Sequence, residues 1–201
     1  MSKAQALKII RTTAALILTL VLSIFLLPKG FRIYKYLTVW AFIFTTCYFL
    51  LMLLGYLYTN IYKILPWYFC ILWGLNWAVT IIYWPIIFVN DPTELHEKIM
   101  FHSLPLIFTI LEFLFNKAKF ERKFFMPCIY VIICYSVFYI IYVIVKEKAI
   151  YKGIDFESGL IYPLFIVFCV FAYAFLEAGR FFKLKLITLE ENIENLEYKA
   201  I

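Results

Sequence analysis

Residues 124–145 read FFMPCIYVIICYSVFYIIYVIV, a run of 22 residues in which no side chain carries a formal charge. A helix that crosses a hydrocarbon layer of about 30 Å needs roughly 20 apolar residues, so this run has the length of one membrane span. The run is continuous and does not alternate, which favours a helix over a barrel strand, because a lipid-facing backbone must satisfy its own hydrogen bonds. We therefore predict a transmembrane helix here.

The same pattern recurs along the 201-residue chain, of which 65% is hydrophobic. The six apolar runs are 12–27, 37–58, 64–89, 99–115, 124–145 and 160–176. Together they hold 120 residues and one formal charge, Glu112, whereas a soluble chain of this size needs a polar surface. The sequence thus predicts an all-α polytopic membrane protein with a bundle of six transmembrane helices. Five spans with one re-entrant segment is the alternative, because 12–27 is short and 99–115 contains His102 and Pro105.

The distribution of basic residues predicts the orientation of the chain. Of the 19 Lys and Arg residues, 12 fall on the side that holds both termini and seven on the other side. The positive-inside rule therefore places both termini in the cytoplasm, for a protein of the endoplasmic reticulum or plasma membrane. Residues 1–182 are predicted to form the transmembrane domain, and 183–201 a short cytoplasmic amphipathic helix. That helix lies on the membrane surface or, in the alternative, docks a protein partner.

The remaining composition narrows the partners and the compartment. Met1–Arg11 is basic and contains no acid, so the mitochondrial inner membrane is the alternative location. The net charge of +6 requires no nucleic-acid partner, because clusters of basic residues beside the spans are attracted to anionic membrane lipid. The five cysteines lie inside the spans and have no CxxC spacing, which predicts small core residues and no metal site. No cofactor is predicted.

Polar side chains inside a bilayer are costly, so each of them is a candidate functional residue. The chain has only two histidines, which excludes multi-histidine metal clusters and bis-histidine haem binding. Transport is disfavoured, because the spans show no paired set of charges and no pair of broken helices. As candidates within the spans we take a hydroxyl, an imidazole, an amide and a carboxylate, namely Thr38, His102, Asn76 and Glu112.

Thr38, His102 and Tyr162 are predicted to lie at one depth. They are the second, fourth and third residues of spans that enter from the non-cytoplasmic side, within roughly 5 Å of one plane at 1.5 Å per residue. A threonine hydroxyl needs an adjacent base to act as a nucleophile, and His102 is the only imidazole so placed. The alternative is a hydroxyl at a helix start and an interfacial histidine bonded to a carbonyl that Pro105 leaves without a donor.

Four short motifs follow one another on this frame. They are Tyr34-Lys35-Tyr36-Leu37-Thr38, the stretch 84–95 with its acidic part 90–95, His102 with Glu112 ten residues later, and the stretch 159–164. In that order they resemble the K-Y/F-L-T element, the acidic loop, the H-x9-E element and the G-x-W-x-Y-P element of the androgen-induced protein family, which includes the androgen-dependent tissue-factor-pathway-inhibitor regulator. Leu160 stands where this family usually has tryptophan. The resemblance covers roughly residues 30–182.

The resemblance implies a six-helix membrane hydrolase whose substrates are fatty-acid esters of hydroxy fatty acids, with Thr38 as nucleophile and His102 as base. Tyr162 or backbone N–H groups at a helix start are candidates to stabilise the oxyanion. For Asn76 we expect an interhelical hydrogen bond, with a substrate contact as the alternative. For Glu112 we expect a structural bond to a neighbouring helix. The alternative function is a catalytically silent lipid-binding or scaffolding subunit of a larger membrane complex. Such a subunit would leave Thr38 and His102 apart, or plugged and without a lipid-accessible cavity.

Overall fold

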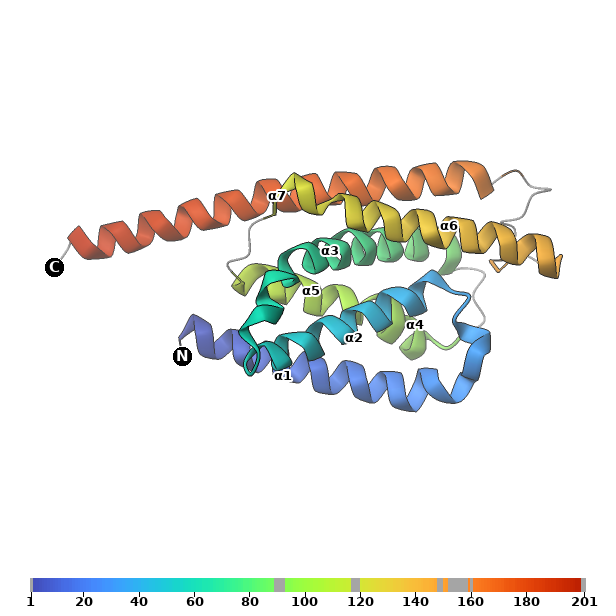
Figure 1. The fold of residues 1–201 in the computed structure, drawn as a ribbon, viewed down its shortest axis with the longest axis horizontal. Coiled ribbons are helices and arrows are strands. Elements are labelled where there is room, and N and C mark those ends of the chain that lie inside the picture. Colours follow the sequence, from blue (N-terminus) through green and yellow to red (C-terminus); the bar gives the residue numbers. More distant parts are fainter. Residues whose placement is uncertain are drawn as a thin grey trace.

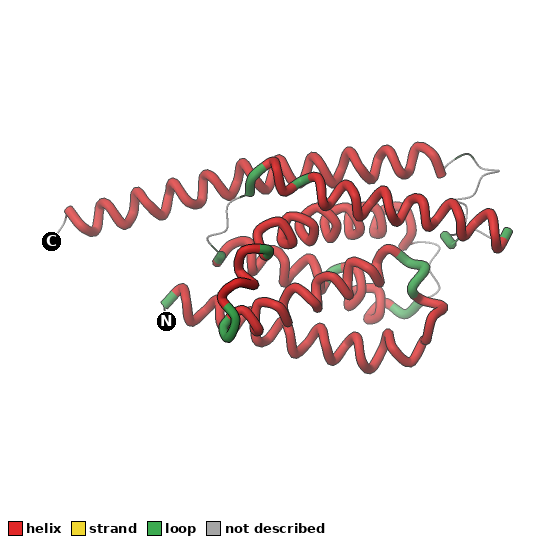
Figure 2. The backbone as a smooth tube through the Cα atoms, in the orientation of Figure 1, coloured by secondary structure: helices red, strands yellow, loops and turns green. Residues whose placement is uncertain are grey.

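The computed structural model confirms the predicted all-α fold. It describes residues 2–88, 93–116, 120–147, 150–151, 159 and 161–199, without the side chains of 31, 59, 86, 161, 162, 164 and 190–199. Within those ranges every regular element is a helix (Figure 1, Figure 2). Six helical stretches there are long and apolar enough to cross a membrane. The chain is an integral multi-pass membrane protein.

The helices follow the predicted order. They are α1 (Lys3–Val21), α2 (Leu37–Gly55), α3 (Leu65–Ile82), α4 (Leu95–His102), α5 (Leu104–Phe115), α6 (Met126–Lys146) and α7 (Ile161–Lys199), with π turns at Leu22–Leu26 and Tyr83–Ile87 and 3-10 turns at Leu27–Ile33, Thr59–Lys63 and Arg122–Phe124. The start of α1 and the end of α7 lie at the same end of the bundle (Figure 1), as an even number of crossings requires.

Helix α1 begins earlier than the predicted span at 12–27. The Ser2 hydroxyl accepts a hydrogen bond from the Gln5 N–H, and the Gln5 side chain accepts one from the Ser2 N–H. This capping box starts the helix at Lys3, so Arg11 lies within α1. After α1 the chain passes through Gly30, whose φ of +64° is a conformation that favours glycine. The polar residues at the start of the chain, from Lys3 to Arg11, therefore belong to the first helix of the bundle.

The predicted fourth span, 99–115, consists of two helices. Pro105 has no N–H to donate to the carbonyl of Phe101, and its ring disfavours a continuous helix. Ser103, with φ −109° and ψ −37°, separates α4 from α5. Together the two helices have the length of one span, Leu95–Phe115. The structure therefore agrees with six spans and not with the five-span alternative.

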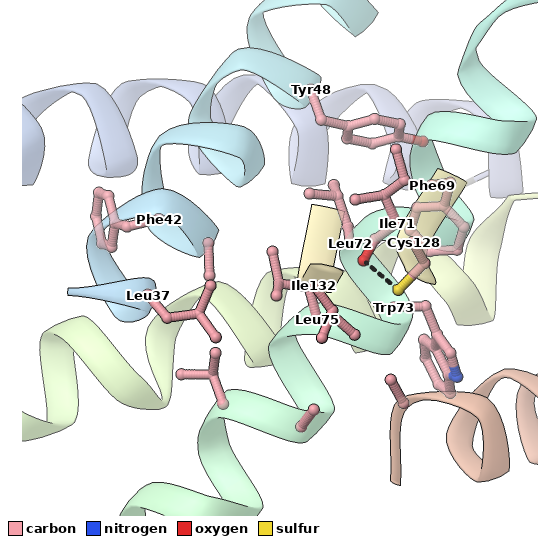
Figure 3. Close-up of a cluster of buried hydrophobic side chains, with 14 of the residues drawn as sticks. Leu37, Phe42, Tyr48, Phe69, Ile71, Leu72, Trp73, Leu75, Cys128 and Ile132 are labelled. Carbon is pink, nitrogen blue, oxygen red and sulfur yellow. Dashed lines mark hydrogen bonds between the residues drawn. The ribbon is translucent and has the colours of Figure 1, made fainter. Parts of the chain in front are cut away.

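Helix α3 is the centre of the bundle and packs against α2, α5, α6 and α7. Figure 3 shows side chains of α3, among them Leu72 and Leu75, packed beside Cys128 and Ile132 of α6. All four of these side chains are almost completely buried. The Cys128 thiol lies 3.8 Å from the carbonyl oxygen of Ile71, to which it donates. Close contact between α3 and α6 thus forms the middle of the core.

The cysteines do not all belong to this core. Cys70 and Cys128 are buried, whereas Cys47 and Cys134 are exposed on the outer surface of the bundle. The prediction of core positions for all five is wrong for these two. In a membrane the outer face of a helix is as apolar as its inner face, so an apolar residue type does not reveal burial.

Helix α7 continues without a break through the domain boundary predicted at residue 183. Lys183 is 2% exposed, and its ammonium group donates to the carbonyls of Phe113 and Asn116 at the end of α5. The last carbonyls of a helix lack partners in that helix, and a cation placed there also complements the helix dipole. The segment predicted as a separate surface helix therefore starts inside the bundle.

Gly179 of α7 lies against the indole ring of Trp73 of α3. A Cβ atom at position 179 would lie 2.5 Å from Trp73 Nε1, and the indole N–H is held by the Phe175 carbonyl at 2.7 Å. We expect Gly179→Leu to lower the free energy of unfolding by about 1–3 kcal/mol, because the ring cannot move away without losing its bond. Titration with dodecyl sulfate in mixed micelles measures the free energy of unfolding. Ala174→Leu, on an exposed position of the same helix, is the control, and an equal loss there would contradict the packing argument.

Candidate functional site

Thr38 and His102 lie in contact at one end of the bundle. Thr38 Oγ1 and His102 Nδ1 are 3.3 Å apart, although 64 residues separate them in the sequence. Thr38 is the second residue of α2, and His102 is the last residue of α4. The depth counted from the sequence therefore agrees with the structure for these two residues. Tyr162 lies in the first turn of α7, but its side chain is outside the described residues.

The position of His102 is fixed by two residues of the third span. Its imidazole stacks on the ring of Tyr83, with 3.2 Å between ring centroids and 6° between planes. The hydroxyl of Thr80 donates to the carbonyl of His102 at 2.6 Å. The ring is thereby held with Nδ1 toward Thr38. When Nδ1 accepts the Thr38 hydroxyl, the neutral ring carries its hydrogen on Nε2, which is the form that can act as a base.

The start of α2 supplies backbone donors beside the Thr38 side chain. Tyr36, the residue before the helix, has an extended backbone and provides no side-chain cap. N–H groups in a first helical turn have no acceptor within their own helix. The N–H of Leu37 donates to the hydroxyl of Tyr151 at 3.2 Å. The N–H of Thr38 is the next donor in this turn, and such groups stabilise negative charge that develops on an oxygen.

Two tyrosine hydroxyls complete the polar part of the site. Tyr135 donates to the carbonyl of Lys35 at 2.9 Å, and its hydroxyl oxygen lies 3.4 Å from that of Tyr151. Burial raises the pKa of Tyr151 to about 12, so this hydroxyl stays protonated at neutral pH. The sequence marks neither residue, since Tyr151 lies in a polar connection and Tyr135 in the middle of an apolar run. Tyr83 is marked only as one of the aromatic residues near the non-cytoplasmic end of the third span, because its stacking on His102 depends on which helices are adjacent.

A small apolar cavity adjoins Thr38. Its volume is about 40 Å³, and α2, α3, α6 and α7 contribute to its walls, among them the side chains of Tyr83, Tyr135, Tyr151 and Phe168. This space suits a water molecule or another small group. An acyl chain requires the lining side chains to move apart. Thr38 itself is 8% exposed.

Asn76 holds three helices together. Its amide nitrogen donates to the hydroxyl of Thr45 on α2 at 3.0 Å and to the hydroxyl of Thr109 on α5 at 2.8 Å. The structure thus contains the interhelical bond expected for Asn76. Because both amide hydrogens are used, the alternative of a donor to substrate does not fit this arrangement.

Glu112 lies in a buried ion pair away from the Thr38 hydroxyl. The guanidinium of Arg11 donates to both carboxylate oxygens, from Nε at 3.1 Å and from Nη2 at 2.8 Å. The Tyr48 hydroxyl and the Asn116 amide donate to the same carboxylate at 3.2 Å and 3.3 Å. The sequence reading that found no paired charge within the spans is therefore wrong, since α1 carries Arg11 into the bundle. Glu112 has the bond to a neighbouring helix that we expected.

Among the residues that the structure describes, no group of three or more His, Cys, Asp or Glu side chains is placed to hold a metal ion. Comparison of the chain with protein-family profiles, with curated proteins and with solved structures finds no match.

Proposed function

We propose that this protein is a membrane-embedded hydrolase of lipid carboxylic esters, with Thr38 as nucleophile and His102 as general base. The observation that supports this is the 3.3 Å approach of Thr38 Oγ1 to His102 Nδ1 beside an apolar cavity. The motif resemblance to the androgen-induced protein family suggests fatty-acid esters of hydroxy fatty acids as substrates. With both termini in the cytoplasm, as the basic residues favour, the site faces the non-cytoplasmic leaflet of the endoplasmic reticulum or plasma membrane.

The proposed reaction has two halves that use the same pair of side chains. In the first, Thr38 Oγ1 attacks the ester carbonyl carbon while its proton passes to His102 Nδ1. The bond between that carbon and the alcohol oxygen then breaks, His102 gives the proton to the leaving oxygen, and an acyl-threonine remains. In the second, water attacks the acyl-threonine with His102 again as base. The fatty acid leaves, and the Thr38 hydroxyl is restored.

Two neutral donors are placed to stabilise the oxyanion in both halves. One is the N–H of Thr38, which has no acceptor in its own helix. The other is the hydroxyl of Tyr151, which lines the same cavity and accepts the Leu37 N–H, and whose hydrogen turns from the oxygen of Tyr135 toward the substrate. Neither donor loses its proton near neutral pH, so both act without a preceding ionisation. Tyr162 stays a sequence-based candidate for this role.

Covalent trapping tests the proposed nucleophile. We expect an alkyl fluorophosphonate, which loses fluoride to an activated hydroxyl, to label the full-length protein in detergent micelles on Thr38. Tandem mass spectrometry locates the adduct. Thr38→Ala should abolish the label, and His102→Ala should reduce it strongly because the hydroxyl then has no base.

The chain provides a matched control for the histidine. His96 is exposed, and its Nδ1 lies 3.1 Å from a carboxylate oxygen of Glu94. It precedes His102 by six residues, which is more than one helix turn. His96→Ala should therefore leave labelling of Thr38 unchanged. A label on another residue, or full labelling of the His102→Ala protein, would overturn the proposed mechanism.

A further inference from the structure

A groove lies on the surface between α2 and α6, apart from the cavity beside Thr38. Its volume is about 720 Å³, within the range of pockets that hold small ligands. Its lining consists of Arg32, Tyr34, Lys35, Trp40, Ile43, Phe44, Phe138 and Tyr142. Charged and apolar residues are segregated in this lining, which indicates an amphiphilic ligand.

The charged end of the groove consists of Arg32 and Lys35, which precede the first residue of α2. In the described ranges of the chain, no carboxylate forms an ion pair with either side chain. Lys29, at the same end of the bundle, differs in this respect, since it pairs with Glu97 at 2.8 Å. Two cations without a carboxylate partner, at the boundary of a membrane span, favour an anionic group.

The apolar end of the groove is a trough that runs along two helices. Trp40, Ile43 and Phe44 are three and four residues apart on α2, so they share one helix face. Phe138 and Tyr142 are four residues apart on α6 and share a face in the same way. Because the cations lie before the start of α2, the trough extends from them into the apolar layer. The trough therefore lies at the level in the membrane that the acyl chains of a lipid occupy.

The two ends are held in place before any ligand binds. The indole N–H of Trp40 donates to the carbonyl of Tyr34 at 2.7 Å, which fixes the segment that carries both cations. The Trp40 ring also packs edge-on against Tyr135 of α6, with 5.5 Å between centroids. A preformed site orders few groups on binding and so retains more of its interaction energy.

We propose that this groove binds one phospholipid with an anionic headgroup. Arg32 binds headgroup oxygens through its planar fork of donors and Lys35 adds a second positive charge, while an acyl chain lies over Trp40 and Phe44. A soluble phosphate would leave the apolar trough unused, and a zwitterionic headgroup would gain less from the two cations. Binding here is independent of the proposed hydrolase activity.

Native mass spectrometry of the full-length protein in a non-ionic detergent tests this site. We expect phosphatidylglycerol to bind more tightly than phosphatidylcholine with the same acyl chains. Each cation removed should weaken phosphatidylglycerol binding about fivefold, which corresponds to about 1 kcal/mol, so Arg32→Ala with Lys35→Ala should weaken it about 25-fold. Added salt should weaken the wild-type interaction as well.

Matched variants separate the groove from general charge and from misfolding. Lys63→Ala removes an exposed cation at the opposite end of α2 and should change nothing, while Arg32→Lys with Lys35→Arg should retain the preference. Ile43→Trp fills the trough without a change of charge and should also weaken binding. Equal binding of the two phospholipids, full binding by the double alanine variant, or equal competition by inorganic phosphate or oleate would overturn the proposal.

Discussion

Thr38→Ala is expected to abolish ester hydrolysis, with kcat lowered by on the order of 10⁴ or more, because the atom that forms the acyl intermediate is gone. Thr38→Ser keeps a hydroxyl at the same place and should retain most of the activity. His102→Ala should lower kcat by about 10²–10⁴, the usual contribution of a positioned base. Release of fatty acid from a fatty-acid ester of a hydroxy fatty acid, with the protein in lipid nanodiscs, measures all three.

The controls for these variants come from the same helix and the same residue types. Thr46 also lies buried in α2, where its hydroxyl donates only to the carbonyl of Phe42 at 2.9 Å. Thr46→Ala and His96→Ala should therefore leave turnover within about twofold of wild type, since surface or locally bonded positions have small effects. Turnover at the wild-type rate in Thr38→Ala would refute the nucleophile. Absence of turnover in the wild type would favour the scaffolding alternative.

The common depth of Thr38 and His102 could be predicted from the sequence, whereas their contact at 3.3 Å also requires that α2 and α4 are neighbours. Spans that enter a membrane from the same side place residues near their starts in one plane, whatever the lateral packing. Lateral neighbours are a different matter. Nothing in the sequence indicates that Tyr83 stacks on His102 or that Tyr151 reaches the N–H of Leu37, because these contacts depend on which helices are adjacent. The depth count therefore identified the two residues as candidates, and the packing of the helices brings their side chains into contact.

The ends of the helices were predicted less well than their number. Hydropathy marks where a chain enters hydrocarbon, whereas a helix ends where caps and backbone donors require it. Arg11 and Lys183 illustrate this, because both lie in polar segments by sequence and are buried in the structure against partners on α5. A charged side chain can be buried in the bundle when a carboxylate, as for Arg11, or backbone carbonyls, as for Lys183, accept its hydrogen bonds.

Glu112→Leu is expected to lower the free energy of unfolding by about 3–5 kcal/mol, because it leaves the guanidinium of Arg11 buried without a counter-charge. Both side chains of this pair are almost completely buried, at 9% and 0% exposure. Titration with dodecyl sulfate, followed by circular dichroism, measures the loss. Glu97→Leu is the control. Glu97 forms an ion pair with Lys29 in which both side chains are partly exposed, so Glu97→Leu should lower the free energy of unfolding by less than about 1 kcal/mol.

The double variant Arg11→Met with Glu112→Leu distinguishes an ion pair from a general need for polarity. It removes both charges, so we expect it to recover part of the stability lost in Glu112→Leu. Recovery should be incomplete, because the hydroxyl of Tyr48 and the amide of Asn116 then lose their acceptor, at about 1–3 kcal/mol for each buried donor. A double variant no more stable than Glu112→Leu would contradict the pairing.

The same variants decide whether Glu112 is structural or part of the chemistry. Glu112 lies ten residues after His102 and its carboxylate is fully occupied by Arg11, Tyr48 and Asn116, so its loss should act through folding. Thr38→Ala, by contrast, removes one part-buried hydrogen bond between α2 and α4, to His102, and should lower the free energy of unfolding by only about 1 kcal/mol. Activity per folded molecule should therefore persist in the double variant and vanish in Thr38→Ala. A folded double variant without activity would instead assign the pair of Arg11 and Glu112 a role in the reaction.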